Sequence, residues 1–193
     1  MEKNRNTIRL AKMGMLVAIA VVLVYFIHFP IIPAVPFLEY DPADISILIG
    51  TFAFGPLAGV ILTVVTSFVQ GLTVSASSGA YGIIMHIIAT SVFALTAGLI
   101  YKKNKTKKGA VIALAAGTAA MAAVMCPANL MITPLFMGVE RSVVVSLLPY
   151  IILFNIIKGE SSIQIDILAS QILINFLPLI PGAEMCQNHL PGF

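Results

Sequence analysis

Long runs of apolar residues dominate this chain, and short polar or proline-rich segments separate them. The first run, residues 13–29, contains no Asp, Glu, Lys or Arg. Such continuous runs predict membrane-spanning helices, because strands of a transmembrane β-barrel alternate apolar and polar residues over segments of about ten. The composition agrees: of 193 residues, 59% are hydrophobic and 10% are charged, whereas soluble domains carry about 25% charged residues. We therefore expect an all-α integral membrane protein.

Two basic clusters set the expected topology. Together they hold nine of the eleven Lys and Arg residues: Lys3, Arg5, Arg9 and Lys12, then Lys102, Lys103, Lys105, Lys107 and Lys108. The positive-inside rule places both clusters in the cytoplasm. The first helix, residues 13–29, then runs outward, and the chain must cross the membrane an odd number of times before it reaches the second cluster.

The break in the middle of the chain follows from this count. Residues 43–74 are apolar enough for one long helix, but Gly55-Pro56 is a strong turn signal within that run. Splitting there predicts two short helices, Ala43–Phe54 and Leu57–Leu72, followed by a third at about Ala80–Tyr101. A helix of twelve residues rises only about 18 Å and cannot cross a core of about 30 Å unaided.

The remaining apolar sequence predicts two more helices. One covers about Gly109–Met131, an outer loop follows at Ile132–Ser142, and the last helix starts near Ser142 or Pro149. We expect residues 1–180 to form a single six-helix membrane domain with both termini in the cytoplasm. The last thirteen residues, 181–193, are expected to be a disordered tail.

The segment Phe29–Asp44 is expected to be an extracellular lid over a binding site. It holds four of the eleven prolines and three of the eight acidic residues, Glu39, Asp41 and Asp44. Asp44 suits a helix N-cap. Glu39 is flanked by Phe37, Leu38 and Tyr40, which favours a carboxylate held against an aromatic ligand; the alternative for all three acids is solvated loop charge.

Lys158 is the most informative single residue. It lies about nine residues, or about 13 Å, beyond Pro149, and a lysine at such depth is costly unless it is paired or faces water. Asn155 precedes it by three positions on the same helix face, and Asn129 could face both. The alternatives are a lysine that snorkels from a helix end and an asparagine that only joins two helices.

Other polar positions are weaker candidates. Gln70 and Thr73, near the outer end of their helix, could line the site or face the loop. His86 has no His, Cys or carboxylate three or four positions away, so no metal site is expected. The pair Gly14-xxx-Ala18 allows close helix approach or partner docking. No nucleotide-binding or hydrolase motif is present, and topology explains the basic clusters, so no nucleic-acid partner is expected.

Several blocks of the sequence are similar to those of a known family. They are FPIIPAVPFLEYDPADISILIGTFAFGPLAGV, QGLTVSASSG, GIIMHIIAT, ANLMITPLFMGV and FNIIK, within residues 7–158. They resemble the riboflavin-specific substrate-binding subunits of energy-coupling factor (ECF) transporters. Residues 159–193 depart from that family's pattern.

The resemblance implies a high-affinity riboflavin-binding subunit in a bacterial cell membrane, with riboflavin as bound substrate and no cofactor. Its partner would be an ECF module of one membrane scaffold protein and two ATP-binding subunits, docked through Gly14 and Ala18. The implied ligand contacts are the segment Phe37–Asp41, Asn129, Asn155 and Lys158. Alternatives are a subunit for another vitamin, a small membrane enzyme that uses Glu39 with Lys158, and a purely structural subunit.

Overall fold

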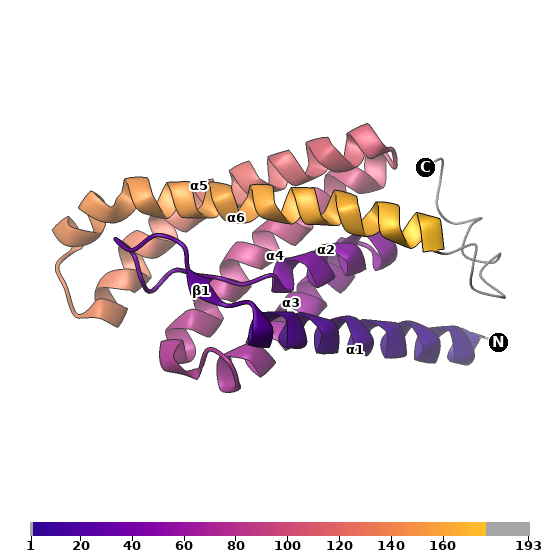
Figure 1. Ribbon diagram of the computed structural model, residues 1–193, viewed down its shortest axis with the longest axis horizontal. Helices are drawn as coiled ribbons and strands as arrows, with labels where there is room; N and C mark the ends of the chain where they lie inside the picture. Colours follow the sequence, from indigo (N-terminus) through magenta and orange to yellow (C-terminus); the bar gives the residue numbers. More distant parts are fainter. Residues whose placement is uncertain (1, 177–193) are drawn as a thin grey trace.

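The computed structural model describes residues 2–176, and these form a bundle of α-helices with one small β-hairpin (Figure 1). In chain order the elements are α1 (Glu2–Phe26), β1 (Phe29–Pro30), β2 (Glu39–Tyr40), α2 (Ala43–Phe54), α3 (Pro56–Leu72), the 3-10 turn η1 (Ala76–Ser78), α4 (Gly79–Lys103), α5 (Lys107–Met137) and α6 (Arg141–Phe176). The expected tail, residues 181–193, lies outside the described residues.

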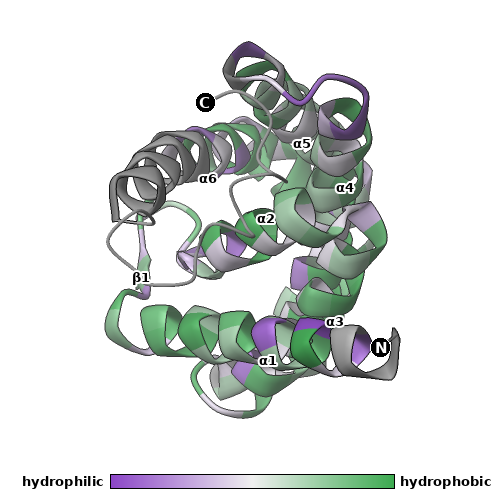
Figure 2. Ribbon diagram, turned by 90° about the vertical axis from the view of Figure 1, so that its right-hand side faces the viewer, coloured by the Kyte–Doolittle hydropathy of each residue, from purple (hydrophilic) through white to green (hydrophobic). Residues whose placement is uncertain are grey.

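Four of these helices are long and apolar enough to cross a membrane. The qualifying spans are Asn6–Phe26, Gly79–Lys103, Lys108–Met137 and Arg141–Ser161, whereas α2 and α3 are shorter apolar helices. Hydrophobic residues run along the helices, and hydrophilic ones gather near helix ends (Figure 2). The expectation of an all-α membrane protein is confirmed.

The break between α2 and α3 lies where the sequence predicts it. Gly55 separates the two helices with φ 98°, a left-handed conformation that favours glycine. Pro56 follows at the first position of α3, where its missing N–H costs no helical hydrogen bond. Gly98 of α4 lies against this corner, because a Cβ there would come within 3.0 Å of the Cα of Pro56.

Several helix ends differ from those expected. α1 begins at Glu2 and ends at Phe26 rather than covering residues 13–29. α5 continues through Pro134 to Met137, and α6 begins at Arg141 and continues through Pro149, so only 138–140 separate them. The predicted outer loop at 132–142 was wrong in length, because apolar bundles tolerate proline inside helices. Gly138, with φ 65°, ends α5 instead.

The α1–α2 connection, residues 27–42, is anchored at both sides of the bundle. Its β1 and β2 pair antiparallel, with Phe29 opposite Tyr40 and Pro30 opposite Glu39. Val35, between the two strands, is fully buried against Val144 and Ile151 of α6. The connection therefore lies against the last helix and close to the first, as Figure 1 shows.

Candidate binding site

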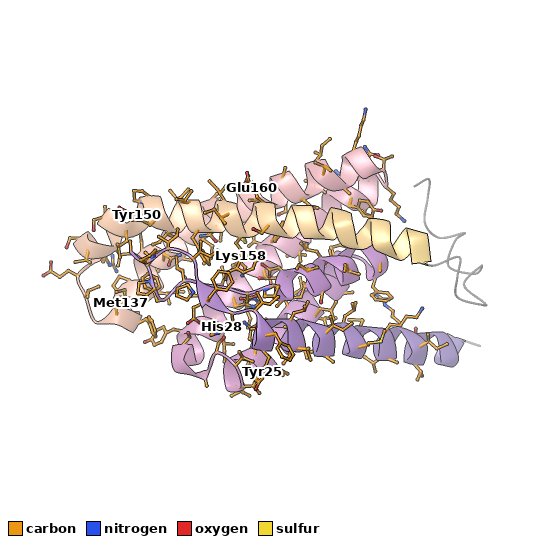
Figure 3. The ribbon with its side chains drawn as sticks, in the orientation of Figure 1. Tyr25, His28, Met137, Tyr150, Lys158 and Glu160 are labelled. Carbon is orange, nitrogen blue, oxygen red and sulfur yellow. The ribbon has the colours of Figure 1, made fainter. Side chains whose placement is uncertain are left out.

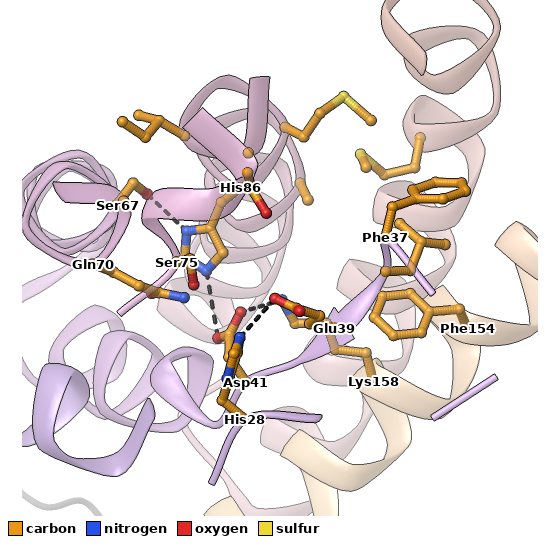
Figure 4. A pocket seen from close by; sticks show the side chains of 18 of the residues that line it. His28, Phe37, Glu39, Asp41, Ser67, Gln70, Ser75, His86, Phe154 and Lys158 are labelled. Atoms are coloured by element: carbon orange, nitrogen blue, oxygen red, sulfur yellow. Dashed lines mark hydrogen bonds and ion pairs between the residues drawn. The ribbon is translucent and has the colours of Figure 1, made fainter. Parts of the chain in front are cut away.

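A cavity of about 120 Å³ lies between the α1–α2 connection and helices α3 to α6. Its walls combine apolar and polar side chains from segments far apart in the sequence (Figure 4). Seven of the ten expected ligand residues line it: Phe37, Leu38, Glu39, Asp41, Gln70, Asn155 and Lys158. Phe37 and Phe154, with Met85 and Met125, form its apolar part.

An ion cluster occupies the floor of this cavity. The Lys158 ammonium lies 3.2 Å from an oxygen of Asp44 and 3.5 Å from an oxygen of Asp41. The Nε2 atom of His86 lies 3.6 Å from Asp41 and 3.7 Å from Asp44. Lys158 thus reaches from α6 toward the start of α2 (Figure 3). The Lys158 side chain is buried, and its charge is paired.

Further hydrogen bonds hold the two carboxylates in place. The Thr90 hydroxyl donates to Asp44 at 2.7 Å, and the backbone N–H of Ala43 donates to Asp41 at 3.2 Å. Burial alone would raise the pKa of Asp41, but the charge of Lys158 and the contact with His86 outweigh it. The pKa of this carboxyl therefore lies below its ordinary range, and Asp41 is ionised at neutral pH.

Ser67 fixes the orientation of His86. Its hydroxyl and the Nδ1 atom of His86 are 2.7 Å apart, while the same hydroxyl donates to the carbonyl of Thr63. Because that hydroxyl proton is committed to Thr63, Nδ1 must carry the hydrogen of the Ser67 contact. The Nε2 atom of the ring held in this way faces the carboxylates of Asp41 and Asp44.

The cluster has the atoms of a metal site but an ammonium already among them. One ligand atom each from Asp41, Asp44 and His86 lies within 4.8 Å of the others. Lys158 supplies a positive charge to both carboxylates at 3.2 and 3.5 Å, and that charge would repel a metal cation. We therefore interpret the group as an ion-pair cluster.

Two amides present polar atoms to the cavity above this floor. Gln70 is buried, and its Oε1 atom has no hydrogen-bond partner among the described residues. The Asn155 amide donates one hydrogen bond, 2.8 Å, to the carbonyl of Ile151, and no other hydrogen bond of this amide is found among the described residues. A buried acceptor without a partner is costly, so this wall favours a ligand that donates hydrogen bonds.

Three of the expected ligand residues do not line the cavity. Asn129 is buried, but its side chain bonds to Met125 and Thr133 within α5. Thr73 is exposed and donates to the carbonyl of Val69. Tyr40, on β2 of the connection, is buried, and its ring centroid lies 5.9 Å from that of Phe29.

Glu39 lies at the cavity, whereas Asp44 has a role that the sequence does not suggest. Glu39 lines the cavity but is half-buried and pairs with His28 at 2.6 Å. Asp44 is fully buried in the ion cluster, and the carboxylate that accepts a backbone N–H at the start of α2, from Ala43, belongs to Asp41. The expectation of an N-cap at Asp44 was therefore wrong. His86 was also missed as a member of the site, because its acidic neighbours come from another part of the chain.

The structure thus has apolar membrane helices around a small mixed cavity, which are features of a membrane protein that binds a small molecule. A model of the ECF transporter substrate-specific component matches residues 8–165, and the chain belongs to this family. Members of the family are transporter subunits, so the expectation that the chain is not an enzyme is confirmed.

Relatives of known name cover almost the whole chain. The chain is 34% identical over 187 residues to the riboflavin transporter RibU of Staphylococcus aureus (strain TCH60), covering 93% of this chain and 96% of that protein. It is 31% identical over 195 residues to the riboflavin transporter FmnP of Bacillus subtilis (strain 168), covering 94% and 98%. A solved structure of the S component of a bacterial ECF transporter superposes with a TM-score of 0.78 at 33% identity, covering 89% of this chain and 98% of that one.

Proposed function

We propose that this chain is the riboflavin-binding subunit of an ATP-driven ECF vitamin transporter. The similarity to two riboflavin transporters over nearly their whole length supports this substrate. The observation that carries the proposal is the cavity, which is lined both by the polar side chains of Gln70, Asn155 and Lys158 and by the aromatic side chains of Phe37 and Phe154. Riboflavin has matching parts, a planar apolar ring with polar edges and a chain of hydroxyl groups.

Each part of the cavity has a specific role in this proposal. The isoalloxazine ring packs among the apolar side chains Phe37, Phe154 and Met125. The ribityl hydroxyls or the ring N–H donate to Gln70 Oε1, and Asn155 bonds the ring edge. Lys158 donates to a ligand oxygen while the two carboxylates hold its position.

The α1–α2 connection acts as a lid in this proposal. The cavity of about 120 Å³ is smaller than the sites of about 300–1,000 Å³ that hold comparable ligands. Riboflavin entry therefore requires part of the wall to move. A hydrogen-bonded contact between His28 and Glu39 holds the two sides of the connection together, and apolar packing of Val35 joins the connection to α6.

Coupling to ATP hydrolysis is assigned to partner proteins. In this proposal six crossings place both termini in the cytoplasm, and an ECF module of one scaffold protein and two ATP-binding subunits docks on α1. Gly14 and Ala18 are exposed, and the space around Gly14 is open. Two small residues one turn apart suit close approach of a partner helix.

Flavin binding by the purified chain tests the proposed substrate. We expect the fluorescence of riboflavin to be quenched stoichiometrically as the protein is added in detergent, because the ring becomes buried against aromatic and charged side chains. Other vitamins with different ring systems should not compete at equal concentration. Absence of quenching at micromolar protein, with the helical circular dichroism spectrum intact, would contradict the proposal.

A further inference from the structure

A second, larger cavity lies near the end of the bundle where α1 begins and α4 ends. Its volume is about 400 Å³, and it lies between α1, the corner that joins α2 to α3, and the end of α4. Three cationic side chains line it, from Arg9, Lys102 and Lys105. We call this site the basic cavity; none of its lining residues belongs to the riboflavin site.

The basic cavity carries positive charge that no described acidic side chain neutralises. No Asp or Glu is among its lining residues. The ion pairs found between described side chains all involve the first site or His28 with Glu39, and none includes Arg9, Lys102 or Lys105. Three cations around one hollow repel one another, so an anion bound among them would be stabilised.

Two contacts with Phe54 fix the position of the Arg9 guanidinium. Its Nη2 atom donates a 2.9 Å hydrogen bond to the carbonyl of Phe54, the last residue of α2. Its guanidinium also lies over the Phe54 ring, 5.7 Å from the ring centroid. One N–H donor is used in this way, and the other four keep the fork geometry that matches a phosphate group.

Helix ends of both signs meet at the cavity, because α2 and α4 end there and α3 begins there; of these, the beginning of α3 favours an anion. Gly55, with φ 98°, turns the chain so that α3 starts at the cavity wall, and Leu57 in its first turn lines the cavity. The first backbone N–H groups of a helix have no intrahelical partner and carry a partial positive charge. Anions, and phosphate groups in particular, bind at such helix ends.

An exposed apolar stripe continues from the rim of the basic cavity along α3. Leu57 is 75% exposed, and Ile61 and Val65, one and two turns further on, are 55% and 44% exposed. These residues point away from the bundle on one helix face. A molecule with an anionic head and an apolar tail could therefore use the cavity and the stripe together.

We propose that the basic cavity binds a phosphate group through Arg9, Lys102 and Lys105, and the adjoining stripe favours the head group of an anionic phospholipid as its source. Basic pockets between membrane helices on the cytoplasmic side suit such head groups. Free phosphate shares the same chemistry, so the experiment must separate the two sources.

Native mass spectrometry of the full chain in detergent provides the test. The protein is mixed with phosphatidylglycerol, with phosphatidylcholine or with inorganic phosphate, and retained adducts are counted. The test variants are Arg9→Gln and the pair Lys102→Gln/Lys105→Gln. The matched control is Lys103→Gln/Lys108→Gln, which removes equal charge from exposed lysines that do not line the cavity. Riboflavin quenching verifies the fold of each variant, and Lys105→Gln alone replaces the pair if the pair is unfolded.

We expect wild type and the control to retain phosphatidylglycerol in preference to phosphatidylcholine. Affinity should fall about fivefold for each cation removed from the cavity. Retention of inorganic phosphate with the same dependence on Arg9 and the lysine pair would support the site with a soluble phosphate source. Equal losses in the control and test pairs, or no preference for an anion in wild type, would overturn the proposal.

Discussion

The ammonium nitrogen of Lys158 lies 3.2 Å from a carboxylate oxygen of Asp44, and this contact joins α6 to the start of α2. Both side chains are buried, with exposed fractions of 6% and 0%. The pair is part of a larger cluster, because Asp41 and His86 approach the same atoms. The cluster therefore links the α1–α2 connection, α2, α4 and α6 beside the proposed riboflavin site.

Replacing Lys158 tests the structural importance of this cluster. The variant Lys158→Met leaves two buried carboxylates, Asp41 and Asp44, without their cation, and breaking such a pair costs about 3–5 kcal/mol. We expect a large fall in thermal stability without riboflavin, and weaker riboflavin binding. Adding Asp44→Asn should restore part of the stability, because one uncompensated charge is removed. The control Lys108→Met, at an exposed position, should have the melting temperature of the wild type. Equal losses of stability in Lys158→Met and Lys108→Met would contradict the structural importance of the cluster.

Gln70 and Thr73 form a matched pair at the same end of α3. Gln70 lines the cavity, and its Oε1 atom has no partner in the described part of the chain, whereas Thr73 is exposed and lies outside the cavity. Gln70→Ala should weaken riboflavin binding by about 1–3 kcal/mol, the cost of a lost buried hydrogen bond. Thr73→Ala should leave the affinity unchanged. Titration by flavin fluorescence measures both, and equal affinities for the two variants would remove Gln70 from the site.

The pKa of Asp41 predicts how stability depends on pH. Its pKa in the folded protein lies below the ordinary value of 3.8. As the pH falls, this carboxyl therefore binds a proton in the unfolded chain before it does so in the folded protein. The contribution of ionised Asp41 to the free energy of unfolding is therefore complete above the ordinary pKa. It is lost as the pH falls below about 4 toward the pKa of the folded protein. Asp41→Asn should be less stable at neutral pH and should lose less stability on acidification. Thermal melts from pH 7 to pH 3 measure this, with exposed Glu160→Gln as control; an unchanged acid slope in Asp41→Asn would refute the prediction.

The contact between His28 and Glu39 predicts an effect on ligand release. Their side-chain atoms are 2.6 Å apart, and each side chain is about a quarter exposed, 26% and 28%. Such a pair contributes about 0.2–1 kcal/mol, so Glu39→Gln should speed riboflavin dissociation by up to about fivefold with little change in melting temperature. Stopped-flow displacement of bound riboflavin measures the rate. The control Glu140→Gln, at an exposed position, should release riboflavin at the wild-type rate. If Glu39→Gln also releases riboflavin at the wild-type rate, the contact between His28 and Glu39 does not hold a lid closed.

Added bulk at Gly14 separates docking from ligand binding. No atom lies within 4 Å of a Cβ built at Gly14, so Gly14→Leu fits the isolated subunit. We expect unchanged riboflavin binding but loss of uptake in cells that express the ECF module, because the partner helix can no longer approach. Ile19→Phe adds bulk at another exposed position of α1 and should preserve uptake. Normal uptake by Gly14→Leu would place the docking surface elsewhere.

Local sequence features accounted for much of the fold. Continuous apolar runs predicted the membrane helices, and Gly55-Pro56 predicted the break between α2 and α3. The burial cost of a lysine identified Lys158, and helical spacing placed Asn155 beside it at the cavity. These inferences succeeded because each depends on chain neighbours or on a residue's own transfer free energy, both of which are written in the local sequence.

The tertiary structure alone decided which polar groups meet. Asp44 and His86 have no partner at helical spacing, and only the packing of α2, α4 and α6 brings them to Lys158. The Asn129 side chain likewise forms its hydrogen bonds within α5, with Met125 and Thr133, and does not reach the cavity. A sequence shows that a buried charge needs a counter-charge. Which one it finds depends on helix rotation and crossing, and these are set by the packing of the whole bundle.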